Sequence, residues 1–379
     1  MKNFIFLIIL GAVLSAASSV NAEFQIRSED GTSTLKLKGL AQLDGRFFIG
    51  LPQNLGVNTF LPRSIRPILE GTVYDRFSFR LAPDFGNGAA VLQDAYLDVR
   101  FVPELKLRGG KFKEPVGLER LQAENNQLFV ERGLPTNLVP NRDVGLQLFG
   151  DLGVVSYAVG AFNGVADGAS ADTDPNDGKD VAGRLFVQPF SKTEIESLQG
   201  LGVGIAGTYG KQKGTTASPN LPTFRTPGQQ TFFRYLNDTT STPNNITVAS
   251  GTVYRLAPQA NYYWGPFGLF GEYVRSSQRV TNNNGSTNLL NHAWQTAASY
   301  VLTGEKASYK GVKPKNPLDP KEGKWGAVEI AARYNELRVD GSAFPNFADY
   351  EQTLFAGGAA AGANRQSEKA ILSRLELAF

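Results

Sequence analysis

The segment LKLKGLAQLDGRF, residues 35–47, alternates apolar and polar side chains over the length of a long β-strand. Successive side chains of an extended strand point to opposite faces, so the alternation gives this segment one apolar face and one charged face. The apolar face holds Leu35, Leu37, Leu43 and Phe47, and the polar face holds Lys36, Lys38, Gln42, Asp44 and Arg46. The segment therefore predicts a strand that separates an apolar environment from an aqueous one.

The same alternation recurs along the whole chain. It is found near residues 77–84, 94–101, 105–108 and 328–335, and further strands are predicted at about 142–150, 153–162, 180–188, 201–210, 252–263, 267–275 and 292–302. No linker and no change of composition divides these segments. We therefore expect residues 23–379 to form a single β domain.

Two architectures fit such strands, a soluble β-sandwich and a membrane β-barrel. The predicted strands are about 9–12 residues long, which suits a tilted membrane span better than an ordinary strand. Short turns at 74–76 and 103–104 alternate with long polar loops at 163–179 and 211–250. Short periplasmic turns and long extracellular loops are typical of outer-membrane barrels, so we predict a transmembrane antiparallel β-barrel of 14–16 strands.

The N-terminal segment has the pattern of a secretory signal peptide. Lys2 supplies a positive start, residues 4–14 are mainly apolar, and residues 15–22 are small or polar. The apolar run is too short to cross a bilayer as a helix. We expect residues 1–22 to be cleaved after Ala22, although a retained N-terminal anchor is the alternative.

The C-terminal segment is a further amphipathic strand. Leu375, Leu377 and Phe379 alternate with Arg374, Glu376 and Ala378. A terminal aromatic residue on such a strand resembles the signal that the outer-membrane barrel assembly machinery recognises. We therefore expect these three apolar residues to direct assembly.

Composition argues against several other classes of protein. After the leader, no run of 18 apolar residues predicts a membrane helix, and a formal net charge of +3 without a basic block does not indicate nucleic-acid binding. One histidine, His292, and no cysteine make an enzyme, a cofactor or a transition-metal site unexpected. An aspartate-rich loop could hold calcium, or it could be a solvated external loop; its members are Asp167, Asp172, Asp174, Asp177 and Asp180.

One region of the chain resembles a known family. Residues 110–121, GKFKEPVGLERL, with residues 129–135 and 138–145, resemble the phosphate-selective porin O/P family, and the resemblance extends from about residue 34 to the C-terminus. It implies a 16-stranded homotrimeric channel in the bacterial outer membrane, with arginine and lysine lining the lumen. The chain departs from the family pattern at Leu40 and Ser64, where phosphate-selective members carry arginine. Residues 341–366 are also short for two spans, which favours 14 strands.

The polar faces of the predicted strands identify candidate pore-lining residues. The anion-attracting candidates are Lys36, Lys38, Arg46, Arg66, Arg80, Arg100, Lys106 and Arg108. Porins of the family fold their third external loop inward, so residues 112–141 are the candidate constriction loop, with Lys111, Lys113 and Arg120 near the constriction. The alternative is that these charges are solvated and pair with one another across strands.

We expect a passive diffusion channel for small hydrophilic solutes with a weak preference for anions, including phosphate. The expected partners are outer-membrane lipid, lipopolysaccharide, the assembly machinery and two further copies of the chain. The alternative is a structural or adhesive outer-membrane barrel without steady conductance.

Overall fold

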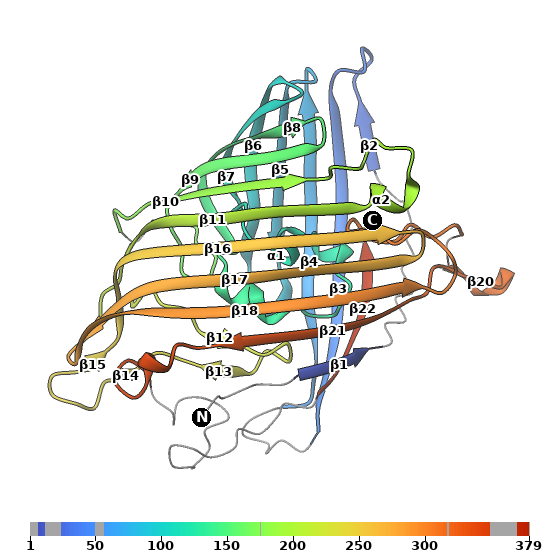
Figure 1. Cartoon of the computed structure of the whole chain (residues 1–379). Helices are drawn as coiled ribbons and strands as arrows, with labels where there is room; N and C mark the ends of the chain where they lie inside the picture. Colours follow the sequence, from blue (N-terminus) through green and yellow to red (C-terminus); the bar gives the residue numbers. More distant parts are fainter. Residues whose placement is uncertain are drawn as a thin grey trace.

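One large antiparallel sheet dominates the computed structural model (Figure 1). The structure describes residues 7–11, 24–49, 57–174, 176–316, 318–348 and 370–378, and the statements below refer to these. Within them, fourteen strands of eight or more residues form the sheet: β3 (Thr34–Phe48), β4 (Thr59–Val73), β5 (Phe77–Asp84), β6 (Val91–Val102), β7 (Leu105–Lys113), β8 (Arg142–Leu152), β9 (Val155–Phe162), β10 (Asp180–Val187), β11 (Leu201–Lys213), β16 (Val248–Trp264), β17 (Phe267–Asn282), β18 (Gly285–Val301), β21 (Glu329–Arg338) and β22 (Ala370–Ala378).

Short elements lie in the connections. The helical ones are η1 (Gly86–Gly88), α1 (Leu118–Leu121), η2 (Glu124–Asn126), η3 (Leu134–Leu138), α2 (Glu196–Gln199), η4 (Pro320–Glu322) and η5 (Gly341–Ala343). The short hairpin strands are β12 (Phe224–Arg225), β13 (Thr231–Phe233), β14 (Asn237–Asp238), β15 (Asn245–Ile246), β19 (Leu318–Asp319) and β20 (Lys324–Trp325). No helix in the described part of the chain is both long enough and apolar enough to span a membrane.

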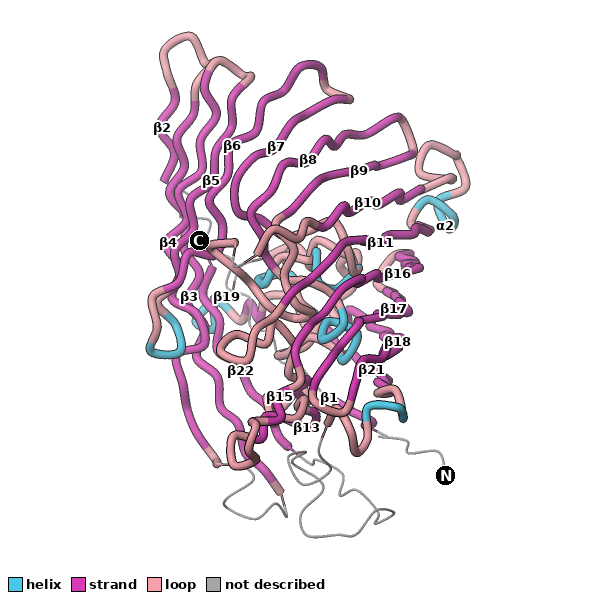
Figure 2. Tube along the Cα trace, turned by 90° about the vertical axis from the view of Figure 1, so that its left-hand side faces the viewer, coloured by secondary structure: helices cyan, strands magenta, loops and turns pink. Residues whose placement is uncertain are grey.

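From β3 to β21, the long strands follow one another in the sheet in chain order, and each is hydrogen-bonded to its neighbour. The last long strand, β22, pairs with the first, β3. The strand predictions are confirmed closely: the strand expected at 180–188 is β10, and the one expected at 201–210 is β11. The sheet curls round an interior that contains α1 (Figure 1) and further short helical segments (Figure 2). Within the described residues β21 and β22 are not paired with each other, so the described sheet is a curled, unclosed barrel wall.

Two strands that are far apart in the sequence share one edge of β3. β22 pairs with β3 from Phe48 to Leu40, and the short strand β2 (Phe24–Arg27) continues along the same edge from Leu37 to Thr34. Only Lys38 and Gly39 of β3 lie between the two paired stretches. At the far side of the sheet, β1 (Leu7–Gly11), within the predicted signal peptide, lies along β21.

The distribution of side chains is that of a membrane barrel. On the outer face, large apolar residues are exposed, such as Leu97 at 49% and Leu146 at 60%. On the inner face, charged and polar residues are buried, such as Asp44 at 0% and Arg255 at 2%. A soluble sandwich would show the reverse, so the outer face is suited to lipid and the inner face to a polar lumen.

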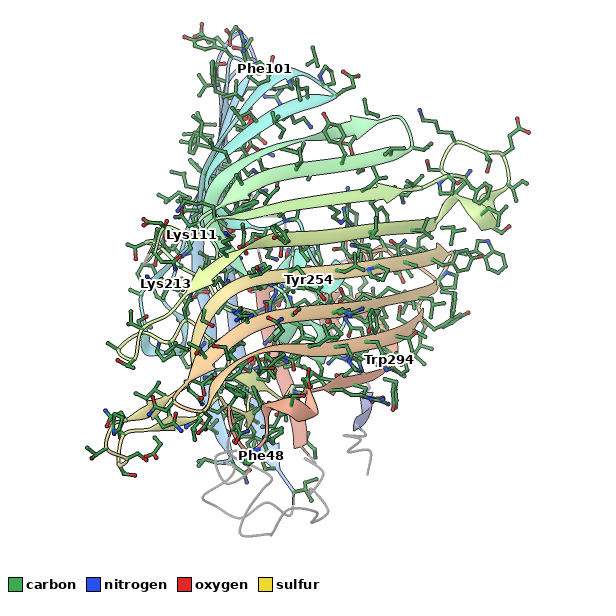
Figure 3. All side chains as sticks on the ribbon, turned by 60° about the vertical axis from the view of Figure 1, so that its left-hand side comes forward. Phe48, Phe101, Lys111, Lys213, Tyr254 and Trp294 are labelled. Carbon is green, nitrogen blue, oxygen red and sulfur yellow. The ribbon has the colours of Figure 1, made fainter. Side chains whose placement is uncertain are left out.

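The two ends of the sheet differ in their connections. Turns at 74–76, 103–104 and 153–154 are short. Tyr74 and Asp75 have positive φ angles of 52° and 53° and are the central residues of a tight turn that the hydrogen bond from the Arg76 amide to the Val73 carbonyl closes (3.2 Å). At this same end, however, residues 188–200 and 302–328 form longer connections. The expected contrast between short turns and long loops therefore holds for most connections. Figure 3 labels Phe101 near the short-turn end and Phe48 near the opposite end.

Candidate functional site

The connection between β7 and β8 folds into the interior of the curled sheet (Figure 2). It contains α1, η2 and η3, and its apolar side chains are buried: Val116, Leu118, Phe129, Leu134 and Leu138. Burying these side chains inside the wall removes apolar surface from water, which favours a packed inward path over a free external loop. We call residues 114–141 the inward loop.

A carboxylate of the opposite wall anchors the inward loop. Glu272 of β17 accepts hydrogen bonds from the backbone amides of Leu118 (2.7 Å) and Glu119 (3.3 Å). These amides begin α1 and have no partner within it, so the carboxylate fulfils the role of a helix cap. The side chain of Gln295 on β18 also donates to Glu272 (2.7 Å), which fixes the carboxylate in place.

A second anchor joins the loop to β21. Glu119 pairs with Arg333 (3.0 Å), and its other oxygen accepts from the amide of Gly133 (2.7 Å). Arg333 also donates to the backbone carbonyl of Glu131 (2.9 Å). Both side chains of the Glu119–Arg333 pair are almost fully buried, so the loss of one would leave the other as an uncompensated charge.

The loop also reaches the wall on the other side of the interior. Glu124 pairs with Arg66 of β4 (2.6 Å) and lies 3.7 Å from Arg132 of the loop itself. The inward loop therefore bridges the lumen from β4 to β17 and β21.

A cavity of about 140 Å³ lies beside the loop, between its helical segments and β4. Five arginines line it, Arg63, Arg66, Arg120, Arg132 and Arg142, whereas its acidic side chains are Asp84 and Glu124. Arg66 pairs with Asp84 (2.6 Å), and Arg142 pairs with Asp94 (2.8 Å). These carboxylates compensate part of the positive charge, and a cationic excess remains.

The ionisation of the loop residues reflects that excess. Burial, together with the positive charges of Arg132 and Arg142, lowers the pKa of Arg120 to about 9. Although burial alone would raise it, the guanidinium groups of Arg66 and Arg132 hold the pKa of Glu124 below its usual range. The shift of Glu124 follows from the positive charges around it, and the same charges add to the effect of burial on Arg120.

A larger cavity of about 760 Å³ occupies the lumen on the short-turn side of the loop. Its cationic lining residues are Lys38, Arg66, Arg80, Arg108, Lys113, Arg142 and Arg184, and its acidic ones are Asp94, Glu124 and Asp151. Several of these cations are paired, for example Lys38 with Glu70 and Arg108 with Asp98 (both 2.7 Å). The pairing across strands that we considered as the alternative is therefore extensive, although cations still predominate.

The residues singled out from the sequence divide into two groups. Lys38, Arg66, Arg80, Arg108, Lys113 and Arg120 line one of the two cavities. Arg46 instead pairs with Glu131 and Asp44, Lys111 with Asp172, and Lys106 lies over the ring of Phe149. Lys36 lies opposite Glu70 in the β3–β4 register, and Arg100 is exposed near the turn that ends β6.

The residues expected to direct assembly lie in the last strand. Leu375 and Leu377 pair with β3 through their backbones, whereas Phe379 lies outside the described residues.

Three lining residues were missed. Arg63 is the extra residue of a β-bulge in β4, Arg132 lies within the loop and Arg142 begins β8. At such positions the two-residue alternation does not specify which way a side chain points. Arg63 stands directly before Ser64, so this arginine lies next to the position that lacks one. The sequence signal that could have found Arg142 is its place directly after the inward loop.

The residues considered for metal binding or catalysis have structural partners. Asp167 and Asp180 both pair with Arg255 (2.5 and 2.9 Å), and Asp174 pairs with Lys179. No group of three acidic or histidine side chains with metal-binding geometry occurs among the described residues. His292 stacks on Tyr273, with ring centroids 6.2 Å apart.

Comparison with known proteins agrees with this geometry. The sequence matches the profile of the family described as phosphate-selective porin O and P over residues 53–364, and no curated protein matches it. The anion-selective porin from Comamonas acidovorans is 11% identical in sequence, with 92% of this chain and 100% of that chain covered and a TM-score of 0.51. OmpT of Vibrio cholerae is also 11% identical, with 83% and 100% covered and a TM-score of 0.47. Since the family match spans most of the sequence, the chain belongs to the phosphate-selective porin O and P family and is a β-barrel porin of the bacterial outer membrane.

Proposed function

We propose that this porin is a passive diffusion channel for small hydrophilic solutes with a weak preference for anions. The observation that carries the proposal is the cavity beside the inward loop, whose lining holds five arginines and two carboxylates. Glu131 pairs with Arg63 and Asp94 pairs with Arg142, so the five arginines face four carboxylates and one positive charge remains in excess. In a narrow lumen with low-dielectric walls, such an excess attracts anions and repels cations. The cavity arginines keep their charge at neutral pH, including Arg120 with its pKa of about 9, so the preference holds at neutral pH.

The preference is weak because most of the guanidinium groups already hold carboxylates. Arg66 binds both Asp84 and Glu124, and Arg142 binds Asp94. A tightly hydrated anion such as phosphate needs several convergent charge-assisted hydrogen bonds to replace its water. Leu40, only 6% exposed, supplies an apolar side chain at an inward position of β3. We therefore infer that phosphate passes but is poorly distinguished from chloride.

The test uses purified channels in planar bilayers. The double variant Arg63→Gln and Arg132→Gln removes two cavity charges, and Arg76→Gln, at a short turn, is the matched control. The double variant should lower the chloride-to-potassium permeability ratio, while the control should keep it. Equal ratios in all three proteins would contradict the proposal. Block of chloride current by submillimolar phosphate would contradict the inferred weak discrimination.

One observation favours the second candidate, a barrel without steady conductance. The connection between β11 and β16 carries a buried aromatic cluster, with Phe224, Phe232 and Phe233 packed near Phe344 and Phe347. Such a cluster fills part of the interior near the long-loop end. Absence of steady conductance in the wild-type protein, with the barrel folded, would select this candidate.

The partners follow from the same proposal. We infer a homotrimer, with lipid and lipopolysaccharide around its apolar belt, and recognition of the C-terminal strand by the barrel assembly machinery. A trimer should appear as a heat-sensitive oligomer on native electrophoresis and by analytical ultracentrifugation. A monomer in both measurements would contradict it.

A further inference from the structure

The wall of the larger cavity carries an aromatic ring and a guanidinium group in one cross-strand row. Phe149 of β8 lies opposite Ala158 of β9, and Ala158 lies opposite Arg184 of β10. All three residues line the cavity of about 760 Å³. Neighbouring strands lie about 4.8 Å apart, so the backbones at Phe149 and Arg184 are separated by about 10 Å. The small side chain of Ala158 leaves the space between them open to the cavity.

The guanidinium group of Arg184 can donate hydrogen bonds to a ligand in the cavity. Its hydrogen bonds within the described residues both go to the side-chain oxygen of Gln259 (3.0 and 3.3 Å), and it makes no ion pair there. Other cavity arginines differ, since Arg80 and Arg108 each hold a carboxylate. Arg184 also lies over the ring of Phe186, 4.6 Å from its centroid, which orients its plane. An anion in the cavity would therefore meet an oriented guanidinium without a competing carboxylate.

The other end of the row is aromatic and rigid. Arg108 is held by both oxygens of Asp98 (2.7 and 2.8 Å) and lies 3.8 Å from the centroid of Tyr96 and 5.0 Å from that of Phe149. Apolar side chains that line the same cavity are Leu40, Ile68, Phe112, Pro115 and Leu121. An inorganic anion gains nothing from these groups. A ligand with a flat apolar part would bury that part against them.

We propose that this row binds aromatic carboxylates, with the ring against Phe149 above Ala158 and the carboxylate on Arg184. Benzoate carries its carboxylate at one end and its ring at the other, which matches a row with a guanidinium group at one end and an aromatic ring at the other. The proposal rests on the proposed function, since it names an organic substrate class for a channel that admits anions. It places a binding step on the short-turn side of the inward loop.

The experiment compares benzoate with acetate, which carries the same charge without the ring. Block of the chloride current is titrated with each ion in planar bilayers. The wild-type channel should bind benzoate about tenfold more tightly than acetate. Phe149→Leu should reduce this ratio to about two or less, and Arg184→Gln should weaken block by both ions. The matched control is Phe101→Leu, because Phe101 is 51% exposed near the short-turn end and lines neither cavity, and this variant should keep the wild-type ratio.

Two outcomes overturn the proposal: a wild-type ratio below about two, or a ratio that Phe149→Leu leaves at the wild-type value. These outcomes are separate from failure of the proposed function. A channel that prefers potassium to chloride but retains the benzoate ratio would refute anion preference and support the row. A chloride-selective channel that treats benzoate and acetate alike would refute the row alone. Heat modifiability of each variant on electrophoresis establishes that its barrel has folded.

Discussion

Glu114, at the beginning of the inward loop, is fully buried, and neither carboxylate oxygen has a hydrogen-bond partner among the described residues. Burial, opposed in part by Arg255 and reinforced by Asp180 and Asp143, raises the pKa of Glu114 well above its usual range. An ionised carboxylate without partners is costly in such a place, so the folded protein retains the proton.

Retention of that proton predicts a pH dependence. Below the unfolded pKa of about 4.5 both states are protonated, and above it only the folded state holds the proton, so stability falls as pH rises. The loss is about 1.4 kcal/mol per pH unit until the folded pKa is reached. Glu114→Gln cannot ionise and should lose less stability than wild type between pH 5 and pH 8. Urea unfolding in lipid vesicles measures this, and equal losses would show that Glu114 is ionised in the barrel.

Adjacent residues of β9 test the assignment of the two faces. Val159 is 48% exposed on the outer face, whereas Ala158 lines the larger cavity at nearly the same depth. Val159→Arg should cost about 2–4 kcal/mol, because it places a charge in lipid, and Ala158→Arg should cost much less. The free energies of unfolding in vesicles give the comparison. Equal costs at the two positions would mean that the faces are wrongly assigned.

At the scale of elements, the inward loop depends on contacts between distant parts of the chain. Leu118 and Glu272 are 154 residues apart, and their hydrogen bond fixes where α1 begins. Glu272→Ala should detach the loop from β17, which widens the passage and exposes residues 114–141. We expect higher single-channel conductance and faster proteolysis of the loop. The matched control is Glu336→Ala, since Glu336 pairs with Arg338 rather than with the loop. Unchanged conductance and proteolysis in Glu272→Ala would show that the anchor does not position the loop.

The edge of β3 predicts the mature N-terminus. On this edge of β3, Phe24 of β2 pairs with Leu37, and Ala378 of β22 pairs with Leu40. Only Lys38 and Gly39 of β3 therefore lie between the two paired stretches. Cleavage after Ala22 would leave one residue before Phe24. A longer N-terminal extension that continued along β3 would run toward the stretch that β22 already occupies. Mass spectrometry of the purified outer-membrane protein should find Glu23 first, and an intact Met1 would contradict this.

The strands and the inward loop also show which parts of the structure can be predicted from the sequence. The strand positions could be predicted because each strand separates lipid from a polar interior, so a two-residue pattern marks it. The path of the inward loop could not be predicted from its own residues, because Glu272 and Arg333 hold it from β17 and β21. The place of Arg142 in the cavity could not be predicted for a related reason, because its partner Asp94 is 48 residues away in the sequence. The family resemblance, rather than the alternation, indicated that residues 112–141 fold inward.

At the scale of the whole molecule, the polar lumen, the bridging loop and the cationic cavity together account for the proposed preference for anions. Charges that are paired locally still sum to a field over the lumen, and salt screens that field. The preference for anions should therefore be strongest at low ionic strength, where the Debye length is about 30 Å at 0.01 M, and weaker at 1 M, where it is about 3 Å.

The most direct test of the central claim is the reversal potential of the wild-type channel under a tenfold gradient of potassium chloride. The measurement is repeated around 0.01 M and around 1 M salt. We predict a potential of the sign that chloride permeation requires, larger at the lower salt concentration. A potential of the opposite sign at low salt would show that potassium permeates preferentially, and would contradict the claim that the arginines beside the inward loop govern permeation.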